Sequence, residues 1–249
     1  MTTAPTSFRL RLLAPDHWPA WIGLGLLWLL SRIPYRALMM LGGGLGWVFA
    51  RIPGSRRRIA RRNIERCFPQ LDANERERLL EDNLRDAGRM LAEFALAWLG
   101  SKRAIARVPV HIEGLEHVAA AVAAGRGVLL TGAHFSHLEL AGRLLVERGG
   151  VPLAGMYREH GDAAFEWAIR RARLRYATAM FTKYEIRACV RHMRDGGKLW
   201  YAPDQDMRGK DNVFVPFFGI PASTLTATHH LARLSGACVI PFFHRRLAG

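Results

Sequence analysis

Short apolar runs alternate with longer amphipathic patterns in the second half of the chain. The short runs predict buried strands, and the longer stretches, in which apolar residues recur every three or four positions, predict helices. This alternation favours an α/β domain in which helices cover the faces of a sheet. The predicted strands are residues 128–133, 153–157, 179–182, 199–202 and 238–243, and the predicted helices are residues 138–148, 163–176, 186–193 and 223–234.

One long amphipathic pattern precedes this domain and ends at Gly100. Asp72, followed by Glu75 three residues later, is typical of a helix N-cap with a capping box. An apolar stripe on such a helix either packs in a core or covers lipid, and we expect core packing. The stripe consists of Leu80, Leu84, Ala87, Leu91, Phe94 and Trp98.

The N-terminal fifth of the chain contains two apolar stretches, residues 18–30 and 37–50, separated by a segment with Arg32, Pro34 and Arg36. A helix that spans a bilayer needs about 20 apolar residues, so neither stretch spans one alone. Three arrangements stay open: an interfacial hairpin, one tilted span, or a hairpin buried in protein. Four glycines are expected to loosen a helix in the second stretch: Gly42, Gly43, Gly44 and Gly46.

The net charge is strongly positive, because 36 Lys and Arg residues stand against 21 Asp and Glu residues, which gives +15. Such an excess attracts nucleic acid, anionic lipids, phosphorylated substrates or acidic proteins. No nucleic-acid-binding motif is visible. Many of the cations follow the second apolar stretch directly, which is typical of a membrane anchor with a cytosolic basic flank, although a solvated helix face is the alternative. They are Arg51, Arg56, Arg57, Arg58, Arg61, Arg62 and Arg66, and the tryptophans suited to a membrane interface are Trp18, Trp21, Trp28 and Trp47.

The three cysteines, Cys67, Cys189 and Cys238, are far apart and form no C-x-x-C pair. This pattern indicates neither a disulfide framework nor a zinc site. We interpret them as ordinary thiols in a reducing compartment, so the catalytic part is expected to face the cytosol.

Candidate chemistry begins where the first predicted strand ends, at His134. Glu139 follows five residues later at the start of the next predicted helix, so a general base and a carboxylate that orients it are a plausible pair. In open α/β sheets the ligand crevice lies beyond the carboxyl ends of the strands. Three other polar clusters also follow predicted strands: residues 157–159, 204–206 and 244–246.

The residues alone leave a second interpretation of this motif open. Ser136 and Glu139 have the spacing of a capping box, and His137 offers another imidazole. Asp204 and Asp206 suggest a metal site, but their surroundings favour a polar loop or an ion pair, and we predict no metal. His229 and His230 are expected to be surface or core residues, because adjacent helical side chains point in different directions.

Several blocks of sequence, in the same order, resemble the late acyltransferases of lipid A biosynthesis. The resemblance extends from about residue 20 to the end of the chain. It implies the fold of the glycerol-phosphate acyltransferase group, with a mixed sheet, and a membrane-bound enzyme on the cytoplasmic face of the bacterial inner membrane. The blocks are GVLLTGAHFSHLEL (127–140), MYR (156–158), WYAPDQD (200–206), VFVPFFG (213–219) and LARLSGA (231–237).

The resemblance also implies a reaction and roles for residues. A fatty acyl chain would pass from acyl carrier protein, as co-substrate, to a hydroxyl of a Kdo-bearing lipid A precursor, without any cofactor. His134 and Glu139 match the catalytic H-x-x-x-x-[DE] motif, Arg158 the second motif and Asp204 the third. Arg158 would bind a substrate phosphate or stabilise the oxyanion, with a structural ion pair to Asp204 as the alternative.

The same resemblance gives the basic residues possible partners, because acyl carrier protein, the lipid precursor and anionic membrane lipids are all acidic. A solvated face remains the alternative. The arginines concerned are those of residues 51–66 together with Arg170, Arg171, Arg173 and Arg175.

We therefore divide the chain into a polar N-terminal segment (1–17), a membrane anchor (18–50), a basic and amphipathic helical linker region (51–108) and an α/β acyltransferase domain (109–249). The family usually continues beyond the point where this chain ends, so a C-terminally truncated domain is expected. Glu139 in its Leu138-Glu139-Leu140 context resembles the lauroyl-type enzymes more than the myristoyl-type.

Two alternatives to this function were open. One is an acyltransferase of the same superfamily that acts on another membrane lipid, such as a phosphatidylinositol mannoside or an amino-acid lipid. The other is a non-catalytic basic protein that binds membranes, which the net charge alone would permit.

Overall fold

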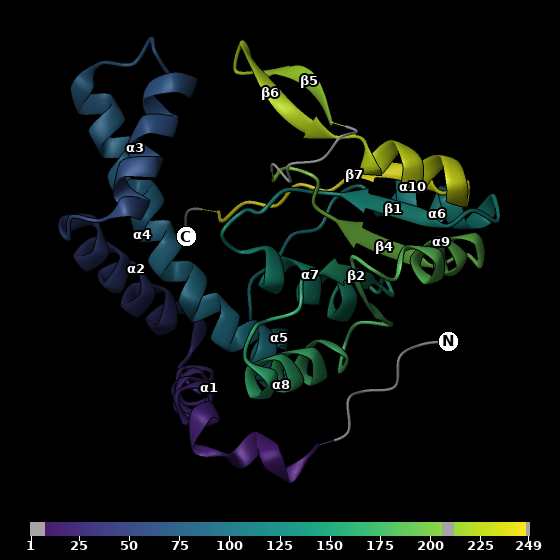
Figure 1. Cartoon of the computed structure of the whole chain (residues 1–249), viewed down its shortest axis with the longest axis horizontal. Coiled ribbons are helices and arrows are strands. Elements are labelled where there is room, and N and C mark those ends of the chain that lie inside the picture. Colours follow the sequence, from purple (N-terminus) through teal and green to yellow (C-terminus); the bar gives the residue numbers. More distant parts are fainter. Residues whose placement is uncertain (1–7, 206–211, 248–249) are drawn as a thin grey trace.

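A parallel sheet forms the centre of the molecule (Figure 1). The computed structural model describes residues 8–205 and 212–247. Within them, five strands pair in the order β3-β2-β4-β1-β7, and every pairing is parallel. The strands are β1 (Val128–Thr131), β2 (Ala154–Tyr157), β3 (Met180–Thr182), β4 (Lys198–Tyr201) and β7 (Cys238–Pro241). The predicted α/β fold is confirmed, but the mixed sheet is not, since the described strands of this sheet all run in one direction.

Helices cover both faces of the sheet because its strands are apolar on both sides. Leu129 points to the face covered by α9 (Ile186–Arg194) and α10 (Ala227–Ser235). Val128 and Leu130 point to the opposite face, against α6 (Leu115–Ala123) and α7 (Leu138–Glu147). Side chains alternate along a strand, so one apolar run contributes to two cores.

The N-terminal helices pack along one side of this domain (Figure 1). The long helix α4 (Ala73–Leu99) connects the N-terminal helices to the α/β domain. Its buried side packs against α7, α8 (Ala163–Arg173) and α5 (Lys102–Ala106). Its N-terminus has the predicted capping box, in which Asp72 and Glu75 each bond the other's backbone N–H at 2.8 Å. The core position of its apolar stripe is confirmed for Leu80, Leu84 and Trp98, which are buried, whereas Leu91 is 37% exposed.

The second apolar stretch forms one continuous helix, α2 (Tyr35–Arg51), and does not loosen at its glycines. Gly42 and Gly46 instead let α2 approach α4 closely at Gly88. A Cβ atom on Gly46 would lie 2.6 Å from the backbone of Arg85, so no larger residue fits there. The low helix propensity of glycine is offset by this close packing between two helices.

Helices α1 (Trp18–Leu30), α2 and α3 (Ser55–Cys67) are separate, and the first two correspond to the predicted anchor. No helix in the described part of the chain has both the length and the apolar character required to cross a bilayer. One continuous helix over residues 18–50 is not found, because α1 and α2 are separate helices. Two short 3-10 helices, Leu10–Leu13 and Pro15–His17, precede α1.

An antiparallel hairpin was missed by the sequence interpretation. Strands β5 (Asn212–Phe217) and β6 (Ile220–Leu225) form it, and it projects away from the central sheet (Figure 1). The helix predicted over residues 223–234 is therefore wrong at its start, because its first three residues belong to β6 and α10 begins at Ala227. Thr224 and Leu225 have β-branched or apolar side chains that suit either structure, and strand pairing decides between them.

Candidate active site

The carboxyl ends of β1 and β4 bring His134 and Asp204 together. Thr131 and Tyr201 are paired neighbours at the ends of these parallel strands, and the two polar residues each follow three positions later. His134 Nδ1 lies 2.6 Å from Asp204 Oδ1, and the His134 backbone N–H donates to Asp204 Oδ2 at 2.9 Å. The carboxylate therefore fixes both the ring and the backbone of the histidine.

This contact selects the form of the imidazole that can act as a base. A carboxylate beside Nδ1 favours the tautomer with its proton on that nitrogen, which leaves the lone pair of Nε2 available. The side chains of His134 and Asp204 are 40% and 36% exposed, so a substrate can reach them. Trp200, on β4, stands edge-on to the imidazole at a centroid distance of 6.4 Å and limits its movement.

Glu139 has different partners from those expected. Its carboxylate accepts a hydrogen bond of 2.7 Å from Trp98 Nε1, on α4, and it forms an ion pair with Arg173, on α8. Among the described contacts, the carboxylate that touches the His134 ring is that of Asp204. The sequence pairing of His134 with Glu139 is thus replaced by two pairs, His134 with Asp204 and Glu139 with Arg173.

The capping-box alternative for Glu139 is also not found. Helix α7 begins at Leu138 with His137 as its N-cap residue, and no side chain caps this end within the described residues. Ser136 therefore lies one residue too early to serve as the cap. Glu139 still stands in the first turn, where a negative charge is favourable, but its side chain points to Trp98 and Arg173.

Arg173 was expected at a basic surface, and the structure places it inside the site. Burial acts to lower the pKa of Arg173, but the adjacent Glu139 carboxylate outweighs this effect and raises it. Its guanidinium also lies over the rings of Trp98 and Tyr157, at 5.7 Å and 5.4 Å. Its position in the last turn of a helix gave no indication of this role, because the contacts come from α4 and α7.

Arg143 holds α4 against α7 and so places Trp98 beside Glu139. The Arg143 side chain is buried, and its Nη1 donates to three backbone carbonyls at the end of α4, those of Leu96, Ala97 and Gly100. The last carbonyls of a helix generally lack intrahelical donors. The Leu96 carbonyl already accepts from the Gly100 N–H at 3.0 Å, and the arginine adds a donor to all three. A salt bridge of 2.8 Å to Glu147 neutralises the charge.

A cavity of about 370 Å³ connects these groups. It reaches from His134, which is exposed, to buried residues of the core such as Leu153 and Met180. Its volume lies in the range of about 300–1,000 Å³ that is typical of small-molecule pockets. Most of the lining side chains are apolar or aromatic, and they include Phe94, Trp98, Leu138, Val146, Met156, Phe165, Ile169, Tyr176 and Trp200.

Arg158 lies on the wall of this cavity, just after β2. It is exposed and forms no salt bridge with any residue the structure describes. The alternative of a structural ion pair with Asp204 is thus not found, because both oxygens of that carboxylate bond His134. The exposed guanidinium on the cavity wall is a cation that a ligand can reach.

His137, the second imidazole of the motif, has a different environment. Its ring packs against that of His244 at a centroid distance of 4.4 Å. Neither of its ring nitrogens, nor those of His244, has a hydrogen-bond partner within residues 8–205 and 212–247. Burial lowers the pKa of His137 to about 4 and that of His244 to about 3. His137 is absent from the described lining of the cavity, so His134 is the better candidate base.

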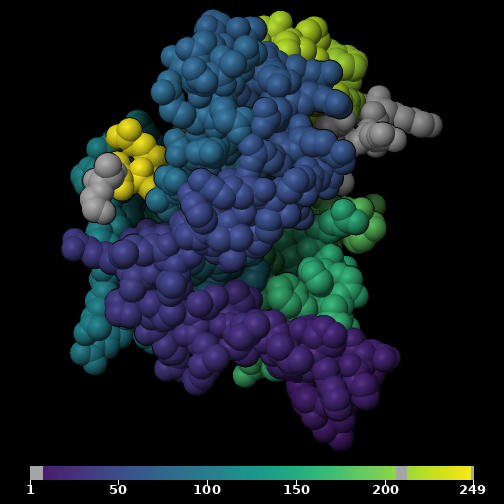
Figure 2. Space-filling model, turned by 90° about the vertical axis from the view of Figure 1, so that its left-hand side faces the viewer, coloured from purple at the N-terminus to yellow at the C-terminus, as the bar shows by residue number. Residues whose placement is uncertain are grey.

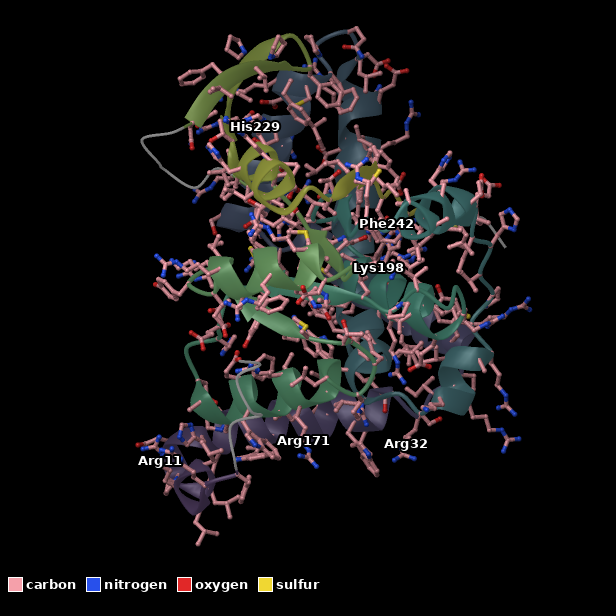
Figure 3. All side chains as sticks on the ribbon, turned by 90° about the vertical axis from the view of Figure 1, so that its right-hand side faces the viewer. Arg11, Arg32, Arg171, Lys198, His229 and Phe242 are labelled. Carbon is pink, nitrogen blue, oxygen red and sulfur yellow. The ribbon has the colours of Figure 1, made fainter. Side chains whose placement is uncertain are left out.

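The other predicted basic residues of α8 also differ from a simple charged surface. Arg170 is buried, and Arg175 donates to the backbone carbonyl of Trp98. Arg171 is exposed and points outward at the bottom of the molecule, near the Trp167 ring at 5.7 Å (Figure 3). The expectation that these arginines form a free docking surface is therefore wrong for Arg170 and Arg173.

The remaining polar candidates fall outside this site. His229 and His230 are exposed neighbours on α10, as expected for surface residues (Figure 3). Asp206, the second carboxylate of the considered metal site, lies outside the described residues. The Asp204 carboxylate instead contacts the His134 ring.

Comparison with known proteins agrees with the resemblance seen in the sequence. Residues 6–249 match the model of the bacterial lipid A biosynthesis acyltransferase family. The chain is 38% identical to the lipid A biosynthesis lauroyltransferase of Escherichia coli K12 over 99% of this chain and 79% of the relative. It is 37% identical to the palmitoleoyltransferase of the same organism, over 94% of this chain and 76% of the relative.

A myristoyltransferase of Escherichia coli K12 is less similar, at 26% identity over 92% of this chain and 71% of that protein. The alternative that the net charge had permitted, a non-catalytic membrane-binding protein, is thus wrong, and the protein is an acyltransferase. The site geometry and the match along nearly the whole chain agree, and the chain belongs to the bacterial lipid A biosynthesis acyltransferase family.

Proposed function

We propose that this enzyme transfers a fatty acyl group from acyl carrier protein to a hydroxyl of a Kdo-bearing lipid A precursor, with His134 as the general base. The observation that carries this proposal is the 2.6 Å contact between His134 Nδ1 and Asp204 beside a mainly apolar cavity. It supplies a base oriented by a carboxylate next to a space that suits an acyl chain.

The reaction follows from the free lone pair on His134 Nε2. A hydroxyl is a weak nucleophile at neutral pH, so Nε2 takes its proton as the oxygen attacks the thioester carbonyl carbon. When the tetrahedral intermediate collapses, the C–S bond breaks and the same proton passes to the leaving sulfur. The products are an ester and a free thiol, and no covalent acyl-enzyme is formed.

Asp204 is the proposed orienter of the base. During proton transfer the imidazole becomes a cation, and a carboxylate on its Nδ1–H stabilises that cation. Glu139, the residue first expected in this role, is proposed instead to fix the wall of the cavity through Trp98 and Arg173. Arg158 is proposed to bind a phosphate of the lipid or the oxyanion, because it is exposed on the cavity wall.

The cavity is the proposed site of the donor acyl chain. Gly142 on α7 lines it, and a Cβ atom added there would meet no atom within 4 Å, so larger side chains at this position would extend into the space. The shape of such an apolar pocket sets chain-length preference. A lauroyl-like donor remains our proposal for this chain.

The outer faces of α1 and α2 are the proposed contact with the cytoplasmic face of the inner membrane. Figure 2 shows these helices, in purple and dark blue, across one face of the molecule. Arg32 and Arg51 lie over the rings of Trp28 and Trp47, at 4.3 Å and 3.5 Å, an arrangement suited to an interface. The exposed apolar side chains include Trp18, Ile22, Leu26, Leu29, Met40, Leu41, Leu45, Val48 and Phe49.

An interfacial position fits these helices better than burial in protein. Contiguous apolar surface at this scale is rare on monomeric soluble proteins and marks an interaction surface. Amphipathic helices rich in Trp and Leu beside arginines lie in the plane of the interface. This arrangement is the interfacial hairpin among the three that the sequence left open.

Acyl transfer by the purified chain tests the proposal. We expect labelled lauroyl-acyl carrier protein to acylate the Kdo-bearing precursor, and His134→Ala to abolish most of this transfer. His230→Ala, an exposed histidine on α10, is the matched control and should keep full activity. A chain that acylates another membrane lipid but leaves the lipid A precursor unmodified contradicts the proposed acceptor.

A further inference from the structure

The β5–β6 hairpin exposes an unusual amount of apolar surface. The side chain of Phe214 is 75% exposed, and those of Phe217 and Phe218 are 58% and 53% exposed. The side chains of Val213, Val215 and Ile220 are also 47%, 40% and 43% exposed. No residue of the hairpin is among the described residues that line the cavity, so the candidate active site does not account for this surface.

Both faces of the hairpin are apolar. Successive residues of a strand point to opposite faces, so Phe214 and Val215 lie on different sides of the ribbon, and both are exposed. A hairpin that packs on a protein usually keeps one apolar face and one polar face. Exposed apolar side chains on both faces suit surroundings that are apolar on both sides.

The turn of the hairpin places an aromatic ring where the backbone disfavours one. Phe218 has φ +49° and Gly219 has φ +77°, as in a two-residue turn with both central residues left-handed. Asn or Gly is strongly preferred at the first of these positions, and a bulky residue there costs stability. The Phe218 ring contacts a ring outside the hairpin, that of Phe68, and yet remains 53% exposed, so much of its apolar surface is open to a further apolar partner.

A basic helix lies beside the tip of the hairpin. The ring of Phe68, directly after α3, contacts that of Phe218 at a centroid distance of 5.0 Å. Figures 1 and 2 both show the hairpin and α3 at the same end of the molecule. Arg57 and Arg61 of α3 bind Glu77, on α4. The outward-facing side of α3 carries the exposed residues Arg56, Arg58, Ile59, Arg62 and Arg66.

We propose that the β5–β6 hairpin inserts its aromatic side chains into an anionic membrane while the outer arginines of α3 bind the lipid headgroups. Charge complementarity selects the occupant, because clustered arginines beside an exposed apolar tip match phosphate groups above hydrocarbon. An acidic protein would also attract the arginines, but it would cover the ribbon on one face. This contact extends the membrane placement proposed for α1 and α2 and rests on it.

Vesicle binding by tip variants tests this inference. Phe218→Asn creates the favoured Asn-Gly turn, so the hairpin should fold at least as well while it loses its tip aromatic. We combine it with Phe214→Thr, which keeps strand propensity. Tyr184→Asn, which removes an aromatic side chain that is 79% exposed elsewhere, is the matched control.

The expected result is about tenfold weaker partitioning of the double variant into vesicles of phosphatidylethanolamine and phosphatidylglycerol, with Tyr184→Asn unchanged. Arg58→Gln with Arg62→Gln should weaken binding to these vesicles and leave binding to phosphatidylcholine vesicles unchanged. Wild-type binding by the Phe214/Phe218 variant overturns the inference.

A second readout separates this contact from the proposed reaction. With substrate dispersed in detergent, the hairpin variants should keep wild-type transfer, because no bilayer is involved. A loss of transfer in detergent by the hairpin variants overturns the membrane role, whereas absent transfer by the wild type contradicts the proposed function alone.

A fluorescent label tests the insertion directly. The emission of a fluorophore attached to Phe214→Cys, in a Cys67→Ser/Cys238→Ser background, should shift to shorter wavelength when vesicles are added. The same shift caused by acyl carrier protein without vesicles assigns the hairpin to a protein partner and overturns the inference.

Discussion

Glu139 lines the cavity, Asp204 contacts His134 on its wall, and the surroundings of these two carboxylates differ. Asp204 is 36% exposed and contacts His134, a base that can exchange protons with a substrate. Glu139 is 12% exposed and is held by Arg173, a permanent cation, and by the indole N–H of Trp98. Asp204 is therefore paired with a side chain that can gain and lose a proton, whereas Glu139 is paired with a side chain that keeps its positive charge.

This difference is the basis of the separate roles proposed for Asp204 and Glu139, of which the sequence motif had named only Glu139 as the orienter of the base. A carboxylate that stabilises a transient imidazolium must contact the imidazole, which Asp204 does. A carboxylate in a buried ion pair fixes the surrounding helices, since it joins α7 to α4 and α8 through side chains. Variants that remove one member of each pair test this difference.

The largest effect is expected at His134, the proposed base. His134→Ala should lower kcat by about 10²- to 10⁴-fold, because the hydroxyl loses its proton acceptor. Thermal unfolding should change little, since the side chain is 40% exposed. A single-turnover assay with preloaded donor measures this. An unchanged rate of acyl transfer excludes His134 as the base.

The next effect separates the two carboxylates. Asp204→Asn should lower kcat by about 10²-fold and change the pH profile, because the amide no longer favours the useful tautomer. KM for the donor should change little. The pH dependence of kcat/KM for Asp204→Asn and Glu139→Gln measures the contrast, and a profile that changes only in Glu139→Gln restores the original pairing of Glu139 with His134.

Removal of the second carboxylate should act mainly on stability. Glu139→Gln leaves the partly buried guanidinium of Arg173, whose side chain is 17% exposed, without its counter-charge. Such a change costs about 3–5 kcal/mol at a fully buried pair and less here. Chemical denaturation measures this loss. Glu139→Gln with Arg173→Leu should recover part of it, and additive losses in the double variant exclude coupling between these residues.

A smaller, selective effect is expected at the wall of the cavity. Gly142→Leu should shift donor preference toward shorter acyl chains by about tenfold in kcat/KM, because the new side chain fills space and its helix propensity is favourable. Gly44→Leu, at another helical glycine with open space around it, is the control. Unchanged selectivity for acyl chain length places the donor chain elsewhere.

The smallest effect concerns acid stability. In the folded chain, burial lowers the pKa of His137 to about 4 and that of His244 to about 3. The positive charge of Arg246 acts in the same direction on both, as does His137 on His244, whereas Asp86 acts to raise the pKa of His137. Between about pH 6.5 and pH 4 the unfolded chain binds protons that the folded chain excludes, so stability falls as the pH falls.

His244→Phe should flatten this dependence. Denaturation at pH 7 and pH 5 measures it, with His230→Ala as the control. An equal loss of stability in His244→Phe and in the wild type shows that other groups cause the acid dependence.

Local sequence patterns predicted many of the helices and strands. The strands around His134 and the long helix α4 were predictable because apolar periodicity and capping residues act within a few positions of the chain. The hairpin β5–β6 was not, because its β6 residues also fit the start of a helix and its strands pair only with each other. Gly42 and Gly46 were misinterpreted for the same reason, since the backbone that they accommodate belongs to a distant helix.

The sequence by itself determined the fold class, the family resemblance, and the presence of His134, Glu139, Arg158 and Asp204. Only the tertiary structure decided which of them touch. His134 and Asp204 are 70 positions apart, and the register of β1 against β4 brings them together. Electrostatic and hydrogen-bond energies fall off over a few ångströms, so the role of an ionisable side chain depends on neighbours that chain folding supplies.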